Sequence, residues 1–379
     1  MRVTFLVPDL ASNILGATRR LAACIPAPHE VEIAGVAQWG GISPMYDDGF
    51  PYVRVDAPRA YRIPHFFRAV RSLADAATGD IIVAMKACAP SLPAALLAKR
   101  KRGAKVIAYL DEWDAANAAS WTFPQRLRAI LRDWPHPCDD LYAPHWEHRL
   151  RECDAIIGTT TFLERRFHAT RIHLGADTTF FAPPPPAETG ALRARLGLLD
   201  ARPLLVFGGV LRPHKGIAPF LEAIRRLQPT HHPHLLIVGP RNDAVEALLS
   251  DPDTAPFVHC TGPIPHAQMP LHLSLADALL VPLSNTLLAQ SQMPCKVFEA
   301  MAMQKPILAS AVSDLPEVLS GCGYLCPPDD PDATTSALAD LLDHPDAASS
   351  RALLARQKSC STYSFSSTRT QFLSLLSLP

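Results

Sequence analysis

The most informative run of residues in this sequence combines glycines with cations. After an apolar stretch at 204–207 and before a helical pattern that starts at Ile217, the chain reads Gly208-Gly209-Val210-Leu211-Arg212-Pro213-His214-Lys215-Gly216. Glycines at the end of a strand let the backbone approach a ligand. A helix N-terminus preceded by two cations suits a diphosphate. The alternative is a plain strand-to-helix turn whose charges are solvated.

A second run places one carboxylate in an otherwise apolar helix. The pattern predicts a helix over 296–303, and Glu299 lies in its middle. A carboxylate in apolar surroundings is costly unless it is hydrogen-bonded, and sugar hydroxyls are good partners for it. The alternative is a surface glutamate on an amphipathic helix.

The composition limits the class of protein. The chain has 379 residues, of which 48% are hydrophobic and 19% charged, so it is neither disordered nor a coiled coil. Lys plus Arg and Asp plus Glu both number 36, whereas proteins that hold nucleic acid normally carry a basic excess. The sequence lacks an apolar run of about 18 residues, the length of a transmembrane helix. We expect a first strand rather than a signal peptide at the N-terminus, and the nine scattered cysteines indicate reduced cytosolic thiols.

Short apolar runs alternate with helical stretches along the whole chain. The predicted strands are 3–7, 32–37, 81–85, 106–110 and 155–158 in the first half, and 204–207, 235–238, 258–259, 278–281, 306–309 and 323–325 in the second. Continuous apolar strands separated by helices are typical of a parallel sheet buried on both faces. Four prolines at 183–186 predict a stiff connector. We therefore predict an α/β protein with two Rossmann-like, doubly wound domains, 1–180 and 181–360, and a last helix within 361–379.

The motifs in the second half resemble a known family by their order. They are Gly208-Gly209 with Lys215-Gly216, then Leu236-Ile237-Val238-Gly239, Gly262-Pro263-Ile264, Ala276-Asp277-Ala278, Pro294-x-Lys296-x-x-Glu299-Ala300-Met301-Ala302 and Pro306-Ile307-x-Ala309-Ser310. This order resembles retaining GT-B glycosyltransferases of the glycosyl-transferase-group-1 type, most strongly over 200–345. The resemblance implies an acceptor-binding first domain, a nucleotide-sugar-binding second domain and a C-terminal helix that crosses back to the first. The ligands would bind in the cleft between the domains.

The resemblance also implies roles for individual residues. Lys215, with Arg212, would bind the donor diphosphate and stabilise the departing nucleotide, and Glu299 would bind the ribose hydroxyls. The other residues implied to bind the donor are Gly16 in a loop after the first strand, Gly209, the segment Gly262, Pro263 and Ile264 along the base, Ser291, Gln292 and Met293 through backbone amides, and Lys296.

Several positions depart from the family pattern. Ser291 stands where the family often has a second glutamate, and Val210 stands where an arginine often follows the glycine. After the fourth strand, where many relatives carry a histidine, this chain has Asp111, Glu112 and Asp114. We interpret Asp111 or Asp114 as a catalytic group that holds acceptor hydroxyls or the donor sugar. A capped helix start is the alternative.

The function that the resemblance implies is transfer of a sugar from a nucleoside-diphosphate sugar to an acceptor hydroxyl, with retention at the anomeric carbon. The product would be a glycan, a glycolipid or a glycosylated metabolite. Catalysis would be mainly electrostatic, and no cofactor or metal is required because Arg212 and Lys215 offset the phosphate charge. Two alternatives stay open: a non-catalytic sugar-nucleotide-binding or scaffold protein, favoured by Ser291, and a nucleotide-sugar epimerase, favoured by the three carboxylates.

The sequence does not specify the acceptor. We expect a cytoplasmic protein without a nucleic-acid partner, and the apolar and basic segments 61–71 and 97–102 are candidates for contact with the inner face of a membrane. Solvated helix ends explain these segments equally well. Trp113, Trp121, Trp134 and Trp146 would stack on a sugar or cover the cleft, with a local aromatic core as the favoured alternative. His145 and His148, near Asp139, are interpreted as surface residues rather than metal ligands.

Overall fold

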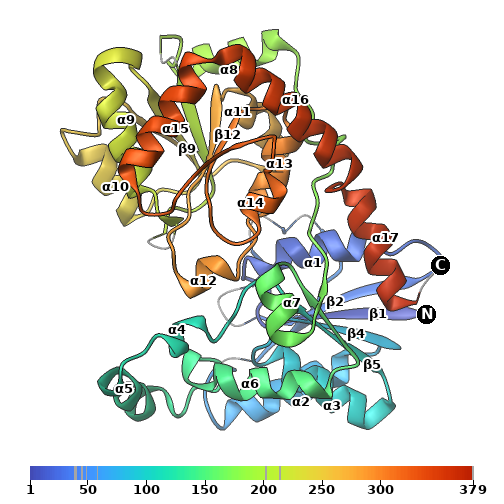
Figure 1. Cartoon of the computed structure of the whole chain (residues 1–379). Helices are drawn as coiled ribbons and strands as arrows, with labels where there is room; N and C mark the ends of the chain where they lie inside the picture. The colour runs from blue at the N-terminus through green and yellow to red at the C-terminus, as the bar shows by residue number, and fades with distance from the viewer. Residues whose placement is uncertain are drawn as a thin grey trace. The chain divides into compact units, whose positions relative to one another are not determined.

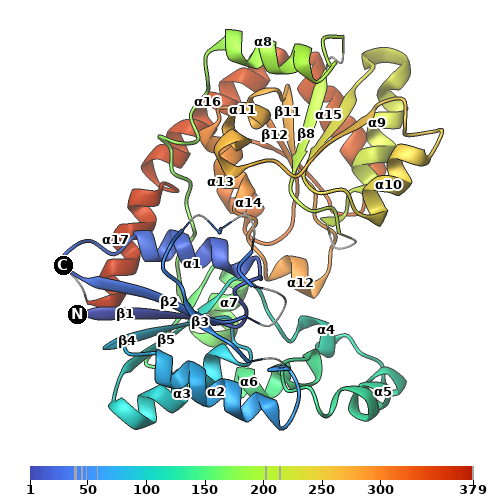
Figure 2. The ribbon, with the colours of Figure 1, turned by 180° about the vertical axis from the view of Figure 1, so that it is seen from behind.

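A computed structural model describes residues 1–37, 41–43, 46–47, 49–57, 59–200, 203–212 and 215–377. The chain divides into two compact units. The first unit comprises Met1–Leu174 with Thr368–Pro379, and the second comprises Gly175–Ser367. Each unit is built on a single parallel sheet that has helices on both faces (Figures 1 and 2). None of the described helices is both long and apolar enough to cross a membrane.

Within the described residues, the sheet of the first unit has seven strands in the order β3-β2-β1-β4-β5-β6-β7, all parallel. Their bounds are β1 Arg2–Val7, β2 Glu30–Val36, β3 Val53–Val55, β4 Ile81–Met85, β5 Lys105–Leu110, β6 Ala155–Gly158 and β7 Thr170–Arg171. Every residue of β4 is buried, as expected for a central strand covered on both faces. The strand order reverses between β1 and β4, so the loops after these two strands leave the same edge of the sheet.

Helices cover both faces of this first sheet. They are α1 (Ile14–Ala23), α2 (His65–Ala76), α3 (Ser91–Arg102), α4 (Ala116–Ala119), α5 (Phe123–Asp133), α6 (Ala143–Arg149), α7 (Thr161–Phe167) and α17 (Phe365–Leu376), with short 3₁₀ turns η1 (Asp140–Tyr142) and η2 (Leu150–Glu152). Figures 1 and 2 show α1 and α17 on one face and α2 and α3 on the other. The predicted return of the C-terminal helix is confirmed: Phe372 of α17 is fully buried and its ring centroid lies 6.2 Å from that of Phe5.

The sheet of the second unit has the order β10-β9-β8-β11-β12-β13 within the described residues, and its strands are again parallel. The strands are β8 Leu204–Gly208, β9 His234–Val238, β10 Val258–Gly262, β11 Ala278–Val281, β12 Ile307–Ser310 and β13 Tyr324–Cys326. The helices are α8 (Pro186–Arg195), α9 (Ala218–His231), α10 (Asp243–Ser250), α11 (Met269–Ser274), α12 (Leu287–Gln290), α13 (Lys296–Ala302), α14 (Leu315–Val318), α15 (Pro331–Asp343) and α16 (Pro345–Ser361), with the 3₁₀ turn η4 (His266–Gln268).

Successive side chains of the central strands in this second sheet enter two different cores. Leu204 and Val206 of β8 pack in a cluster with α8, α11 and α13, whereas Leu205 and Phe207 pack in a cluster with α9, α10 and α15. Side chains alternate between the faces of a strand, so a strand buried on both sides is apolar at every position. This explains why the uninterrupted apolar runs predicted the sheet strands.

The predicted fold class is confirmed, with local corrections. The edge strands β3 and β7 were not predicted, because two or three residues carry too little pattern. The proline run was expected to stay outside any helix, yet Pro186 is the first residue of α8. Proline is tolerated at that position because its missing N–H would have no partner there. Gly16 was expected in a loop and instead lies in the first turn of α1.

Candidate functional site

The strand order of the second sheet places a ligand site between β8 and β11. β9 and β10 continue the sheet on one side of β8, whereas β11, β12 and β13 continue it on the other. In open α/β sheets, ligands bind outside the carboxyl ends of the strands at such a reversal. The loop that follows β8 carries Gly209, Arg212, Lys215 and Gly216, and its residues Pro213 and His214 lie outside the described residues.

Gly216 holds this loop against the loop that follows β11. Its backbone is left-handed, with φ of 56°, and a Cβ at this position would lie 2.6 Å from the backbone nitrogen of Ser284. A side chain would therefore clash with backbone and could not move aside. The glycine thus brings Lys215 to the edge where β8 and β11 end.

Two lysines gather at this edge. The Lys215 Nζ donates to Gln292 Oε1 at 2.9 Å, and the Lys296 Nζ donates to the Gly208 carbonyl and lies 4.4 Å from the Phe207 ring centroid. Burial, and secondly the charge of Lys215, lowers the pKa of Lys296 to about 7. An anion bound here would relieve the repulsion between the lysines and favour the charged form of Lys296.

Gly209 makes room for the Lys296 ammonium. Its φ is 119°, and a Cβ there would lie 2.8 Å from the Lys296 Nζ. Glu299 follows Lys296 by one turn of α13, is half-buried, and acts on Lys296 by raising its pKa against the effect of burial. The helix therefore presents a cation and an anion on one side, three residues apart.

The other residues expected to bind the donor are spread around the same sheet edge. Arg212 is exposed, and its carbonyl accepts the Lys215 amide at 2.9 Å. Gly262 ends β10 and bridges to Gly239 beside β9. Pro263 is exposed, and Ile264 packs partly against the core.

The segment 291–293 is tied to α12. Ser291 is fully buried, and its hydroxyl donates to the Leu288 carbonyl at 2.8 Å. The amides of Ser291 and Gln292 donate to carbonyls of α12, and the Met293 side chain is buried in the core. The Gln292 side chain is thus the part of this segment that contacts a site cation. The roles of these residues toward a donor stay predictions.

The first unit presents a cluster of charges at the carboxyl ends of β4 and β5. Lys86 follows β4 in the left-handed conformation, with φ of 72°. Its Nζ forms ion pairs with Asp111 at 3.4 Å, with Asp114 at 3.1 Å, and with Glu112. The three carboxylates hold the pKa of Lys86 well above its ordinary value, although burial opposes this.

The carboxylates outnumber the lysine in this cluster. Burial, together with the charges of Glu112 and Asp114, raises the pKa of Asp111 to about 6, although Lys86 opposes the rise. Burial also raises the pKa of Asp114. The side chain of Asp111 is 29% exposed, so it is only partly covered. Lys86 was not among the predicted site residues. The signal for it is a single lysine directly after a fully apolar strand.

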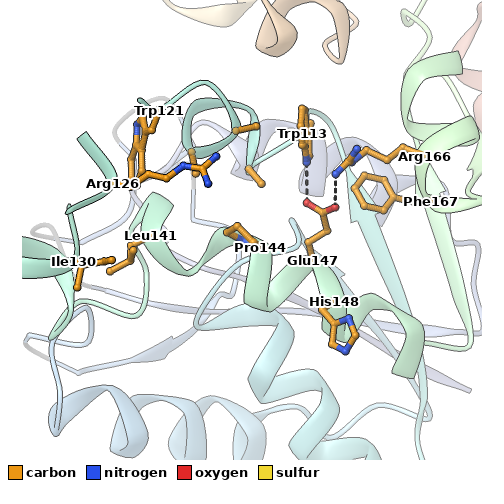
Figure 3. Close-up of a pocket in the computed structure, with 13 residues that line it drawn as sticks. Trp113, Trp121, Arg126, Ile130, Leu141, Pro144, Glu147, His148, Arg166 and Phe167 are labelled. Carbon is orange, nitrogen blue, oxygen red and sulfur yellow. Dashed lines mark hydrogen bonds and ion pairs between the residues drawn. The ribbon is translucent and has the colours of Figure 1, made fainter. Parts of the chain in front are cut away.

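A pocket of about 810 Å³ lies in the first unit beside α5. Figure 3 shows Glu147 on its wall between Trp113 and Arg166. Glu147 accepts hydrogen bonds from Trp113 Nε1 at 2.8 Å and from Arg166 at 2.7 Å, and the Arg166 guanidinium lies 4.0 Å from the Trp113 ring centroid. Trp121 and Phe167 add further aromatic surface. The pocket therefore combines flat apolar walls with polar groups held in place.

The structure also shows the surroundings of the tryptophans, of Gly16 and of the cysteines. Trp113 and Trp146 are buried, whereas Trp134 is exposed, so the four tryptophans do not form one cluster. Gly16 packs against Tyr46, because a Cβ there would lie 2.2 Å from the Tyr46 hydroxyl oxygen. All nine cysteines lie in described residues and are free thiols.

The two parallel sheets, their strand orders and the returning helix α17 define a GT-B fold. Sucrose-phosphate synthase of Thermosynechococcus elongatus has a TM-score of 0.76 at 17% identity, with 100% of this chain and 98% of that chain covered. HepE of Anabaena in complex with UDP has a TM-score of 0.77 at 15% identity, with 100% of both chains covered. At such identities these matches show the fold alone.

Residues 202–344, which lie within the second unit, match the family model described as Glycosyl transferases group 1. The GDP-mannose-dependent alpha-(1-6)-phosphatidylinositol monomannoside mannosyltransferase of Mycolicibacterium smegmatis is 33% identical over 178 residues, which cover 45% of this chain and 46% of that protein. The MMP alpha-(1->4)-mannosyltransferase of Mycolicibacterium hassiacum is 28% identical over 179 residues, covering 46% and 39%. The chain therefore matches somewhat less than half the length of these curated relatives.

Proposed function

We propose that this protein transfers a sugar from a nucleoside-diphosphate sugar to an acceptor hydroxyl, with retention at the anomeric carbon. The observation that carries the proposal is the pair of lysines, Lys215 and Lys296, at the strand-order reversal of the second sheet. Two cations and a glycine-rich loop at that edge suit a diphosphate. The relatives named as mannosyltransferases, and the neighbour solved with UDP, support this choice of donor.

The chemistry assigned to the second unit is stabilisation of the leaving group. As the glycosidic bond to the diphosphate breaks, negative charge grows on the phosphate oxygens. Lys215, Lys296 and the N-terminus of α9 would offset that charge in a partly buried site, where such interactions are strong. Glu299 would hold the ribose hydroxyls. The configuration at the anomeric carbon is retained if the acceptor hydroxyl attacks the same face of the sugar from which the diphosphate departs.

We assign acceptor recognition to the first unit. Asp111, with its pKa raised to about 6, is suited to hold and polarise a hydroxyl near neutral pH, because a base works best when its pKa lies near the working pH. Lys86 would position Asp111 and Asp114 rather than touch the substrate. The aromatic walls of the pocket beside α5 suit a sugar ring or an apolar acceptor group.

A donor panel tests the proposal directly. Thermal unfolding of the full chain is measured with UDP, GDP, UDP-glucose and GDP-mannose, because a ligand that binds the folded state raises its stability by mass action. The stabilising nucleotide sugar is then incubated with the protein and a panel of acceptors that carry free hydroxyls, and the products are followed by NMR. Release of the nucleoside diphosphate together with an α-linked product supports a retaining transferase. Binding without release would indicate a sugar-nucleotide-binding protein, and an epimerised donor would indicate an isomerase; either result overturns the proposal.

A further inference from the structure

Helix α5 exposes the apolar face that a helix normally buries. Phe123, Leu127, Ile130, Leu131 and Trp134 follow each other at positions i, i+4, i+7, i+8 and i+11 and therefore lie on one side of the helix. All five are exposed, Phe123 by 80% and Leu131 by 73%. They make up five of the twelve large hydrophobic side chains that are exposed in the described residues. We call these five residues the α5 stripe.

Helix α5 is attached to the rest of the first unit by the side that faces away from the α5 stripe. Ala129 and Asp133 are the buried residues of the helix. A capping box formed by Thr122 and Gln125 fixes its start, where it satisfies backbone groups that would otherwise lack partners. The exposure of the α5 stripe is therefore a property of an ordered, anchored helix.

The exposed charges on α5 itself are positive, whereas the neighbouring turn carries Asp139 and Asp140 near the buried Asp133. On a helical projection Arg126 lies on one flank of the stripe and Arg128 on the other, and both are exposed. The one acidic residue in α5, Asp133, is buried and forms an ion pair with Arg132 at 2.5 Å, which lowers the pKa of Asp133. An apolar stripe flanked by arginines complements a surface that has anionic groups on its outside and an apolar layer beneath them.

The segments first considered for membrane contact have other partners. Lys99, Arg100 and Lys101 form ion pairs with Asp154, Glu152 and Asp75 of the same unit. In the helix α2, Phe67 is exposed, but its neighbours Phe66 and Val70 are buried. Neither segment offers a continuous apolar stripe with cations beside it, as α5 does.

We propose that α5 docks the first unit on an anionic lipid surface. The α5 stripe lies at the boundary between headgroups and acyl chains, and Arg126 and Arg128 contact lipid phosphates. Arg126 and Ile130 also line the pocket of Figure 3, so the pocket opens beside the docked stripe and can take an amphipathic molecule from the lipid surface. The docking itself does not depend on glycosyl transfer.

Vesicle sedimentation of the full-length protein, without donor or acceptor, tests the proposal. The lipids are phosphatidylcholine alone and phosphatidylcholine mixed with phosphatidylglycerol. We expect partition onto the mixed vesicles that weakens with salt. Leu127→Glu with Leu131→Glu should lower the partition coefficient at least about tenfold. Arg126→Gln with Arg128→Gln should lower it about fivefold per arginine on the anionic vesicles.

The matched control is Leu353→Glu with Leu354→Glu, two leucines of α16 that are exposed by 46% and 50%. It should partition like the unchanged protein. Brominated acyl chains give a second readout, because they should quench the fluorescence of the unchanged protein more than that of Trp134→Phe. Thermal unfolding and binding of UDP or GDP verify that each variant is folded and that its nucleotide site is intact.

Equal partition of the unchanged protein and the Leu127→Glu, Leu131→Glu variant overturns the proposal, as does absence of binding to the mixed vesicles. A concentration-dependent dimer, seen by sedimentation velocity and abolished by the same variant, would assign the α5 stripe to a second copy of the chain and would also overturn it. Loss of vesicle binding with nucleotide binding retained leaves the proposed transferase function untouched, so the two proposals can fail separately.

Discussion

The Lys215 Nζ donates to Gln292 Oε1 at 2.9 Å, and this bond joins the loop after β8 to the segment before α13. The two residues are 77 positions apart in the chain. Lys296 lies close enough for the charge of Lys215 to lower its pKa. An anion that enters this site therefore meets two lysines from different motifs, and its charge favours protonation of Lys296.

Lys215→Ala should reduce turnover of a donor by about 10²–10³-fold, or about 2.7–4 kcal/mol of transition-state stabilisation, the typical cost of removing one charge-stabilising donor. Initial rates at saturating donor measure this. Lys101→Ala, which removes an exposed lysine paired with Asp75 in the first unit, is the control and should keep its rate. Near-normal transfer by Lys215→Ala would contradict the diphosphate assignment.

Gly216→Ala should destabilise the protein by about 1–3 kcal/mol, the cost of forcing a side chain into a strained backbone conformation, because its Cβ meets the backbone of Ser284. Urea unfolding measures the change. Gly190→Ala is the matched control: nothing lies within 4 Å of a Cβ there, and alanine in the helix α8 should stabilise by about 0.5–1 kcal/mol. Equal stabilities of the two variants would show that the backbone of Ser284 does not lie as close to Gly216 as described.

Binding of UDP or GDP at pH 8 should take up a fraction of a proton, up to about one, through Lys296. The free site has a pKa of about 7 for this lysine, so the amine is mostly neutral at pH 8. A bound diphosphate favours the charged form and raises the pKa above 8, so a proton enters on binding and affinity falls as pH rises above 7. Calorimetry in buffers of different ionisation enthalpy measures the uptake. The same uptake in Lys296→Met would exclude Lys296 as its source.

Lys86→Met should destabilise the protein by about 2 kcal/mol, less than the 3–5 kcal/mol typical of a fully buried pair, because the carboxylates keep some exposure. Without the lysine, burial and mutual repulsion raise the carboxyl pKa values in the folded state above their unfolded values. Stability is then lost as pH rises from about 4 and stays low above the folded pKa values. Urea unfolding should therefore show a larger deficit at pH 8 than at pH 5.

A second substitution separates charge repulsion from lost packing in this cluster. Lys86→Met combined with Asp111→Asn removes one of the repelling charges and should recover part of the stability at pH 8. Lys101→Met, which breaks the exposed pair with Asp75, should change stability by less than about 1 kcal/mol. A deficit of Lys86→Met that is independent of pH would mean that the lysine acts through packing alone.

Much of the second unit could be predicted because its signals are local. The strand over 278–281 and the helix start at Lys296 were predicted at their observed positions, because the residue pattern that indicates each element extends over only a few residues. Lys215, Lys296 and Glu299 were also identified from short motifs. The long helix α16 was not predicted, because its apolar and polar residues show little segregation around the helix.

Two features of the first unit could not be predicted from the sequence. The helix α5 spans Phe123–Asp133, and no sequence pattern states which face of such a helix is covered. The carboxylates after β5 were identified, whereas their lysine lies at the end of β4, 25 positions before Asp111. The pairing was therefore invisible until the adjacency of β4 and β5 was known.

The sequence by itself determined the two parallel sheets and the order of the motifs around the second one. Apolar runs, helix caps and glycine turns are signals that extend over only a few residues, so they can be recognised without the tertiary structure. Only the tertiary structure decided that Lys86 forms ion pairs with the acidic cluster, that Ser291 is buried with its hydroxyl bonded to α12, and that the α5 stripe stays exposed. The physical reason is that burial and ion pairing depend on which segments become neighbours, and segments distant in the chain become neighbours only when the sheets assemble.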